Sequence, residues 1–239
     1  MTINSDKKQM TATVCGDRFR YLDIIMAAFV TVLILSNISS SAKIVDLKTS
    51  LFGIPLAFDG GTLLFPLSYI FGDVLTEVYG FKVSRKVIWT GFASLALSCL
   101  VFFLLKILPA DAYWEEYAGS AAYESILGGM CSGGLWIASL SAYLAGEFSN
   151  SFLLAKIKIA MHGRLLFVRT IASTLVGELL DSFIFISIAV LLGVFSTELF
   201  WTLVITNYIL KCLIEIIMTP LTYCAVNQLK KHEGIDVYG

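Results

Sequence analysis

Six acidic residues lie within stretches of the sequence that are otherwise apolar enough to cross a lipid bilayer. They are Asp73, Glu77, Glu147, Glu178, Asp181 and Glu215. A carboxylate at the centre of a membrane helix costs about 2.5–3.5 kcal/mol, so each must face protein or a wet cavity. Lys211 and Arg169 bring the opposite charge to a similar depth. The set predicts a polar pathway or a binding site inside a membrane protein.

Two of the polar groups follow steps of four residues, which places their members along one face of a helix. They are Tyr69, Asp73 and Glu77, and then Asn207, Lys211 and Glu215. Carboxylates one turn apart in a low-dielectric setting cannot both ionise cheaply, so one of Asp73 and Glu77 is expected to carry a proton. These two and Glu215 are the candidates for proton coupling.

Structural roles are open alternatives for some of these residues. Glu77 comes near the end of its apolar stretch, where it could pair with Lys82 or Arg85. Lys211 could neutralise Glu215 within one helix, or it could be the counter-ion for a carboxylate on another helix.

Two strings in different apolar stretches match each other. They are Gly146-Glu147-Phe148-Ser149-Asn150-Ser151-Phe152 and Gly177-Glu178-Leu179-Leu180-Asp181-Ser182-Phe183. In each, the Glu and the residue three later share a helical face, and the glycine lets another backbone or a ligand approach. Gly72-Asp73 is a shorter echo of Gly177-Glu178. Pairing those two stretches is what a three-plus-three inverted repeat would require.

Enzymatic chemistry finds little support in the sequence. His162 and His232 lie outside the apolar stretches, so no intramembrane Ser–His pair is expected, and there is no HExxH string. An aspartyl protease could use Asp73 and Asp181, but the usual Gly-x-Gly-Asp string is absent. Glycine-rich phosphate loops and metal-type spacing of the five cysteines are also missing. We expect neither an enzyme nor a cofactor or metal.

Composition and length then define the elements that position these residues. Of the 239 residues, 57% are hydrophobic and 15% charged, whereas soluble domains are about one-quarter charged. Apolar runs long enough to span a bilayer fall at about 21–42, 60–80, 87–108, 131–155, 165–193 and 200–226. The second run carries Pro66 and ends in polar residues, so it is predicted to be kinked or broken. The fold class is an all-α membrane protein with six transmembrane helices.

Basic residues alternate between the connecting segments. They gather before the first run and after the second, fourth and sixth, whereas the longest intervening segment carries Asp111, Glu115, Glu116 and Glu124. Under the positive-inside rule both termini are cytoplasmic. The expected organisation is a cytoplasmic tail over 1–20, a transmembrane domain over 21–226 and a second cytoplasmic tail over 227–239.

Several strings resemble the queuosine precursor transporter family, which is also classed among vitamin uptake transporters. They are Ser36-Asn37-Ile38 with Lys43, Phe65-Pro66-Leu67-Ser68-Tyr69-Ile70, Gly72-Asp73-Val74-Leu75-Thr76-Glu77-Val78-Tyr79-Gly80, and Arg169 with Ser173-Thr174, Gly177-Glu178 and Asp181-Ser182. The resemblance runs from the first to the sixth run. It implies import, across the cell (inner) membrane, of 7-cyano- or 7-aminomethyl-7-deazaguanine, or queuine, with no nucleic acid as partner and with a homodimer left open.

Such a cargo fits the polar residues. A guanine-type edge presents a ring N–H beside an exocyclic amine, and one carboxylate can accept both. Glu178 lies deepest in its run, so we expect it to be the main contact, with Asp181 and Asn37 in support and Asp73 next. Phe183, Tyr69 or Trp136 could stack on the ring. The full set of expected substrate contacts is Glu178, Asp181, Asn37, Asp73, Glu147, Asn150, Tyr69, Asn207 and Lys211.

The main rival is a substrate-binding subunit of an energy-coupling-factor vitamin importer, which depends on an ATPase partner. Such subunits usually show Ala-x-x-x-Ala on the first helix, whereas here Ala27 and Ala28 are followed four residues later by Thr31 and Val32. An intramembrane enzyme is the weaker alternative.

Overall fold

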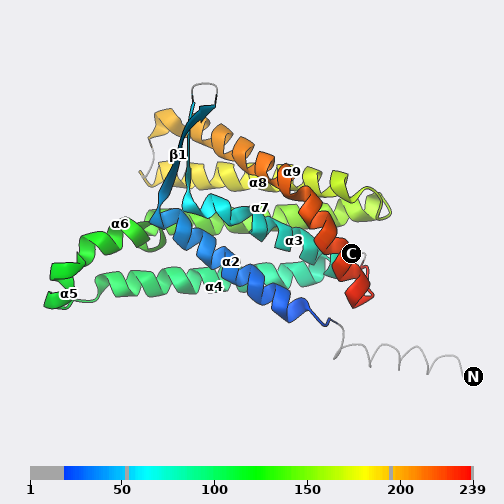
Figure 1. Ribbon diagram of the computed structural model, residues 1–239, viewed down its shortest axis with the longest axis horizontal. Helices are drawn as coiled ribbons and strands as arrows, with labels where there is room; N and C mark the ends of the chain where they lie inside the picture. Colours follow the sequence, from blue (N-terminus) through cyan, green and yellow to red (C-terminus); the bar gives the residue numbers. More distant parts are fainter. Residues whose placement is uncertain (1–18, 52–53, 194–195, 238–239) are drawn as a thin grey trace, which may run out of the picture.

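A computed structural model describes residues 19–51, 54–193 and 196–237 as an elongated bundle of helices from which one β-hairpin projects (Figure 1). The elements in chain order are α2 (Leu22–Ala42), β1 (Ile44–Leu51), β2 (Ile54–Asp59), η1 (Gly60–Leu63), α3 (Phe65–Tyr79), α4 (Phe81–Ile107), α5 (Ala112–Tyr117), α6 (Gly119–Cys131), α7 (Gly133–Ala160), α8 (Leu166–Leu191), η2 (Thr197–Leu199) and α9 (Phe200–Glu233).

Five stretches of the described chain are helical, long and apolar enough to cross a membrane. They are Leu22–Ala42, Phe81–Ile107, Gly119–Ala160, Leu166–Leu191 and Leu203–Glu233. The run predicted at 60–80 forms η1 and the 15-residue helix α3, which alone is shorter than the roughly 20 residues that a span requires. The described chain therefore has the helices of a multi-pass membrane protein, whereas the count of six crossings stays a prediction.

The β-hairpin is a departure from the all-α prediction. Strands β1 and β2 pair antiparallel, with Ile44 opposite Asp59 and Leu51 opposite Ile54. The segment alternates apolar and polar residues from Val45 to Lys48, which is the period of a strand rather than of a helix. The segment falls between the apolar runs predicted at 21–42 and 60–80, because it is too short and too polar to span. The hairpin extends from the end of the bundle where α2 stops (Figure 1).

Helices α7 and α8 pack closely because two glycines face each other where they cross. A Cβ added to Gly146 would lie 3.2 Å from the carbonyl oxygen of Gly177, and one added to Gly177 would lie 3.0 Å from that of Gly146. The two matching strings of the sequence thus meet at one helix crossing. Each string places a polar residue, Asn150 or Asp181, against the other glycine.

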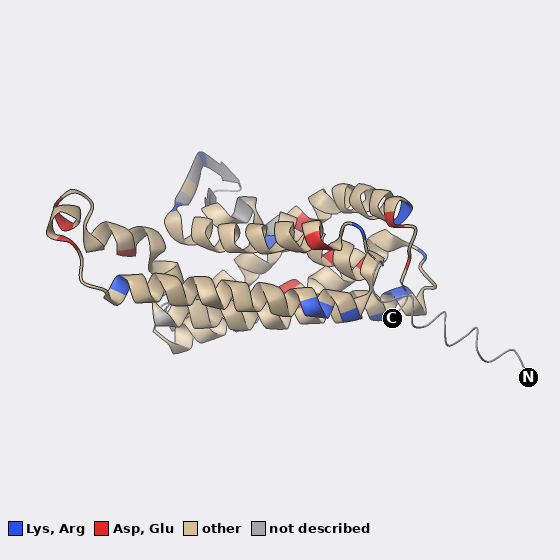
Figure 2. Ribbon diagram, turned by 90° about the horizontal axis from the view of Figure 1, so that it is seen from below, with Lys and Arg blue, Asp and Glu red and all other residues tan. Residues whose placement is uncertain are grey.

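The outer surface of the bundle suits lipid. Large apolar side chains such as Leu97, Leu104, Ile209 and Ile217 are between 46% and 65% exposed along α4 and α9. In Figure 2 several basic residues lie at the end of the bundle near the C-terminus. Helix α9 continues to Glu233, so the tail predicted to start at 227 begins as helix.

Candidate functional site

A cavity of about 130 Å³ lies among five helices, in the half of each helix that is nearer the hairpin end. Helices α2, α3, α7, α8 and α9 all contribute to its lining. The lining residues are Leu33, Asn37, Ser40, Ser68, Tyr69, Ser139, Ala142, Tyr143, Glu147, Asp181, Phe185, Asn207 and Lys211. Six of the nine predicted contacts therefore line one cavity, namely Asn37, Tyr69, Glu147, Asp181, Asn207 and Lys211.

Lys211 of α9 is held by two carboxylates of α8. Its Nζ forms an ion pair and hydrogen bond with Asp181 and lies 3.4 Å from Oε2 of Glu178. Lys211 is therefore a counter-ion for carboxylates on another helix, which was one of the two alternatives. Glu178 is fully buried and is absent from the described cavity lining, whereas its partner Lys211 belongs to that lining.

Glu147 of α7 is the other acidic residue in the lining. Its side chain is 4% exposed, and its Oε2 atom has no hydrogen-bond partner within the described structure. This oxygen lies against the backbone of α3, because a Cβ added to Gly72 would come within 2.9 Å of it. Glu147 is thus a buried carboxylate whose hydrogen-bonding capacity is not filled by the described protein groups.

Asp73 and Asn150 form a polar layer beside the cavity. Asn150 donates a 2.9 Å hydrogen bond to Oδ1 of Asp73, and both side chains are fully buried. The other oxygens, Oδ2 of Asp73 and Oδ1 of Asn150, have no partner among the described residues. Neither residue is part of the cavity lining, so direct contact with a ligand would require a rearrangement.

Glu215 lies in a separate seam between α8 and α9. It is 3% exposed, and its Oε2 atom lacks a hydrogen-bond partner within the described chain. Thr174, Cys212 and Glu215 are among the residues around a very small void there. Glu215 is thus absent from the described lining of the main cavity, to which Lys211 belongs.

Asn37 is already oriented by the protein. Its amide nitrogen donates to the carbonyl of Leu33 at 2.8 Å, and its side-chain oxygen accepts from Ser139 at 2.9 Å. One N–H of the amide remains available for a ligand.

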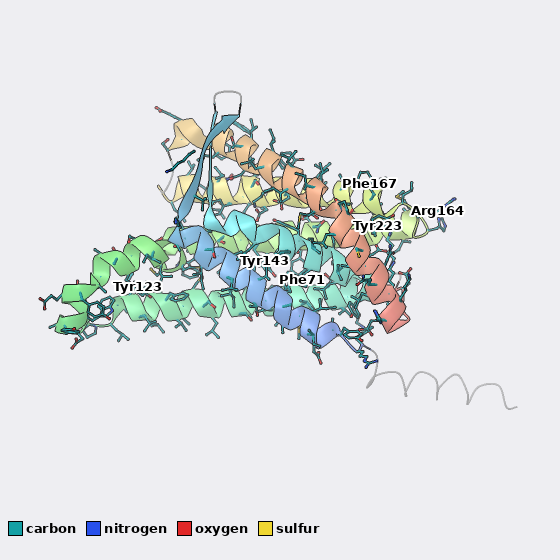
Figure 3. All side chains as sticks on the ribbon, in the orientation of Figure 1. Phe71, Tyr123, Tyr143, Arg164, Phe167 and Tyr223 are labelled. Carbon is teal, nitrogen blue, oxygen red and sulfur yellow. The ribbon has the colours of Figure 1, made fainter. Side chains whose placement is uncertain are left out.

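Several lining residues were missed by sequence reasoning, and spacing could have found two of them. Ser139 and Tyr143 precede Glu147 by eight and four residues, so all three share one face of α7. The Tyr143 hydroxyl donates to the carbonyl of Ile88 on α4 at 3.1 Å. Figure 3 shows Tyr143 within the bundle, whereas Phe167 and Tyr223 lie toward its outer side.

Of the three aromatic residues considered for stacking, Tyr69 lines the cavity. Phe183 is 42% exposed and packs edge-on against Phe200 at 5.8 Å, which places it on the outer surface. Trp136 packs against the hydrophobic core and is not in the described lining.

Glu77 lies at the opposite end of the bundle from the hairpin. It is fully buried and pairs with Arg169 and Lys230, each at 2.7 Å, and with Lys158 at 3.6 Å. The predicted partners Lys82 and Arg85 are not the ones it uses. Lys158 and Lys230 also hold Asp236, at 2.5 and 3.0 Å.

Asp236 follows the last helix. Partial burial acts to raise the pKa of Asp236, but hydrogen bonds and charges from Lys158 and Lys230 outweigh it and keep that pKa below the usual range of an aspartate.

No group of three or more His, Cys, Asp and Glu side chains suited to a metal ion occurs in the described part of the chain. Glu77, Glu178 and Asp181 instead form ion pairs with lysine or arginine. Asp73, Glu147 and Glu215 each have a buried oxygen without a hydrogen-bond partner among the described residues.

Comparisons with known proteins support a single family. A sequence model of the family described as "Putative vitamin uptake transporter" matches residues 59–225. A Bacillus subtilis protein named "Probable queuosine precursor transporter" is 29% identical over 185 residues, covering 77% of each chain. An Escherichia coli protein named "Queuosine precursor transporter" is 23% identical over 197 residues, covering 81% of this chain and 83% of the relative.

A Haemophilus influenzae protein named "Probable queuosine precursor transporter" is 22% identical over 227 residues, covering 91% of this chain and 92% of the relative. No solved structure matches the chain. All of these names are those of transport proteins and not of enzymes.

Proposed function

We propose that this chain, which belongs to the vitamin uptake transporter family, imports 7-deazaguanine bases through the cavity between α2, α3, α7, α8 and α9. It is a multi-pass membrane protein, and we place it in the cell (inner) membrane. The names of the three relatives support queuosine precursors as cargo. The candidates are 7-cyano-7-deazaguanine, 7-aminomethyl-7-deazaguanine and queuine.

The observation that carries the proposal is a carboxylate and a cation in the lining of the same buried cavity. Glu147 has an oxygen without a hydrogen-bond partner among the described residues, and Lys211 is fixed on the lining by Asp181 and Glu178. A guanine-type edge offers two donors, the ring N–H and the exocyclic amine, beside one acceptor, the carbonyl oxygen. Glu147 would accept from the donors and Lys211 would donate to the carbonyl.

This assignment changes the rank of the acidic residues. Glu178 remains a predicted recognition residue, but the described geometry supports an indirect role, since it is fully buried, is absent from the lining and pairs with the lining residue Lys211. Glu147 lines the cavity itself, so we propose it as the direct contact. Tyr69, Asn37 and Asn207 would complete the polar and aromatic wall.

Proton coupling is the energy source that we favour. Asp73 and Glu215 are buried carboxylates with an oxygen that has no hydrogen-bond partner in the described structure. Such groups can exist in a neutral form and exchange a proton during a conformational cycle. Glu77 is the weaker candidate, because its three cationic partners stabilise a fixed negative charge.

Uptake by the purified protein in liposomes tests the proposal. Labelled 7-aminomethyl-7-deazaguanine should enter without any ATPase, unlabelled guanine should compete, and adenine should not. Glu147→Gln replaces an acceptor with a donor, and leaving a buried polar group unpaired costs about 1–3 kcal/mol, or roughly 5–150-fold in affinity. Glu116→Gln, on an exposed segment, is the matched control.

The pattern among variants discriminates between the assignments. A larger loss in Glu178→Gln than in Glu147→Gln would restore Glu178 as the direct contact. Uptake only after an energy-coupling ATPase is added would favour the importer-subunit alternative. Equal competition by adenine and guanine would contradict recognition of a guanine edge.

A further inference from the structure

Five charged residues close the end of the bundle opposite the cavity. We call them the end cluster, and they are Glu77, Lys158, Arg169, Lys230 and Asp236. They come from the C-terminal ends of α3, α7 and α9, the N-terminal end of α8 and the segment after α9. Lys158 and Arg169 are each only 1% exposed. Glu77 is also fully buried, whereas the side chains of Lys230 and Asp236 are 22% and 40% exposed. The end cluster ties four helices together around a buried centre, and Asp236 closes it from the outside.

The last described residues fold back onto this cluster. Lys158 donates to the carbonyl of Val237 at 2.7 Å, and the Val237 N–H donates to the carbonyl of Val78 on α3 at 3.3 Å. Residues 234–237 thus form a strap between α7 and α3. The strap supplies Asp236, which completes the end cluster.

Glu233, at the base of the strap, fastens a further helix. Its carboxylate accepts from the backbone N–H groups of Arg20 and Tyr21 at 2.9 and 2.7 Å, where α2 begins. It also accepts from the Tyr79 hydroxyl at 2.8 Å. The C-terminal end of the chain therefore contacts α2, α3 and α7, all of which also line the cavity.

A hydrogen-bonded polar seam lies between the cavity and the end cluster. Below Glu147 and Asn150 on α7, Ser151 bonds Thr76 of α3 and Ser84 of α4 at 3.0 and 3.1 Å. All three hydroxyl residues are at most 1% exposed. Water could enter between α3 and α7 along these small polar side chains if the two helices separated. In the described structure the hydroxyl groups bond to one another and leave no such path.

We propose that the strap and the end cluster form the inner gate of the transporter, holding it shut on the cytoplasmic side while the cavity serves the outer side. This inference rests on the proposed transport function and on the predicted orientation. Opening would separate Asp236 from Lys158 and Lys230, lift residues 234–237 and release the ends of α3 and α7.

Ion pairs suit such a gate because their charges are stabilised in both the closed and the open state. Separated lysines and carboxylates regain hydration that burial removes, whereas an apolar plug would expose hydrocarbon to water. The closed state is favoured by several charge-assisted hydrogen bonds acting together. Loss of one charge on the strap should therefore shift the balance toward the open state without removing the cavity.

Thiol labelling in membrane vesicles tests the gate without any substrate. A cysteine-free background carries one reporter, Ser68→Cys, in the cavity wall. In inside-out vesicles, a membrane-impermeant reagent should react about tenfold faster when Asp236→Asn is added, as expected for loss of a hydrogen bond between charged groups. Deleting residues 235–239 should have at least that effect. Asp23→Asn, an exposed acid at the same end outside the cluster, is the control and should change nothing.

A double-cysteine variant locks the proposed gate closed instead. Val78→Cys with Val237→Cys uses the backbone contact between these residues to form a disulfide across the strap. Oxidation should abolish labelling from the inside, preserve labelling from the outside and stop uptake. Reduction should restore inside labelling and uptake. This variant also keeps the test decisive if weakened straps fail to fold.

The outcomes separate the gate from the transport proposal. Inside labelling that stays at the wild-type rate in Asp236→Asn and in the truncated chain overturns the gate, as does wild-type uptake by the oxidised disulfide variant. Labelling that follows the gate prediction while no deazaguanine is taken up would support the gate and contradict the cargo.

Discussion

At the scale of single residues, the position of Glu147 depends on the absence of a side chain at Gly72. A methyl group there would approach Oε2 of Glu147 to 2.9 Å, and this atom is the far end of a flexible side chain that can move. Gly72→Ala should therefore leave stability unchanged or raise it by up to about 1 kcal/mol, because alanine favours the helix. Affinity for the base should fall at least fivefold, because the acceptor is displaced. Thermal unfolding and binding, measured on the same detergent preparation, separate these effects, and unchanged affinity would refute the assignment.

Lys211 makes a different residue-scale prediction, since it neutralises two buried acids. Lys211→Met leaves Glu178 and Asp181 without the cation that joins them, and breaking a buried ion pair in this way costs about 3–5 kcal/mol. Adding Glu178→Gln and Asp181→Asn should recover most of that loss while binding stays weak. Denaturation midpoints of the single and triple variants are the measurement. A single variant as stable as wild type would show that the ion pairs contribute little.

The acids of the site could be predicted from the sequence, but which of them line the cavity could not. A carboxylate in an apolar run must be buried with a partner or at a cavity, so Glu147, Glu178 and Asp181 could be chosen from residue type alone. Which of them faces the cavity depends on the rotation and depth of each helix. Depth along the run favours Glu178, whereas in the described structure Lys211 and Asp181 line the cavity and Glu178 does not.

At the scale of elements, the crossing of α7 and α8 controls the site, because it brings Glu147 and Asp181 to one cavity. A methyl group on Gly146 would meet the Cβ of Asp181 at 2.9 Å and the carbonyl oxygen of Gly177 at 3.2 Å. Neither atom can move without its helix. Gly146→Ala should thus destabilise by about 1–3 kcal/mol and weaken binding together. Gly128→Ala on α6, where the added methyl meets nothing within 4 Å, is the control and should do neither.

Element boundaries follow from hydrophobicity where an element is one continuous apolar run, and they do not where the sequence is more polar. The runs predicted at 21–42 and 165–193 correspond to α2 and α8 within two residues at each end. Helices α5 and α6 and the hairpin lie outside the predicted runs, because their amphipathic or alternating sequences lack a continuous apolar stretch. The match of the 146–152 and 177–183 strings reflects a shared packing surface, and whether it also reflects an inverted repeat stays a prediction.

At the scale of the whole molecule, charge is distributed between two unlike ends. The end with the hairpin and the acidic α5–α6 segment holds the cavity, whereas the opposite end holds the basic residues and the end cluster (Figure 2). Lys158, near the C-terminal end of α7, and Lys230, near that of α9, belong to the basic residues on which the predicted orientation rests, and both also pair with Glu77. The predicted orientation and the proposed gate therefore depend on the same side chains.

The orientation itself can be tested with four single cysteines in a cysteine-free background, placed at Lys48, Lys82, Glu116 and Arg164. If α3 with η1 crosses the membrane and the N-terminus is cytoplasmic, a membrane-impermeant reagent outside the cell should reach positions 48 and 116 and miss 82 and 164. If α3 does not cross, positions 48 and 82 must lie on the same side, since no other helix of spanning length separates them in the described chain. A complete reversal would instead expose 82 and 164 and protect 48 and 116. The first pattern is expected because the segments at 82–86 and 156–164 carry the basic residues that resist translocation.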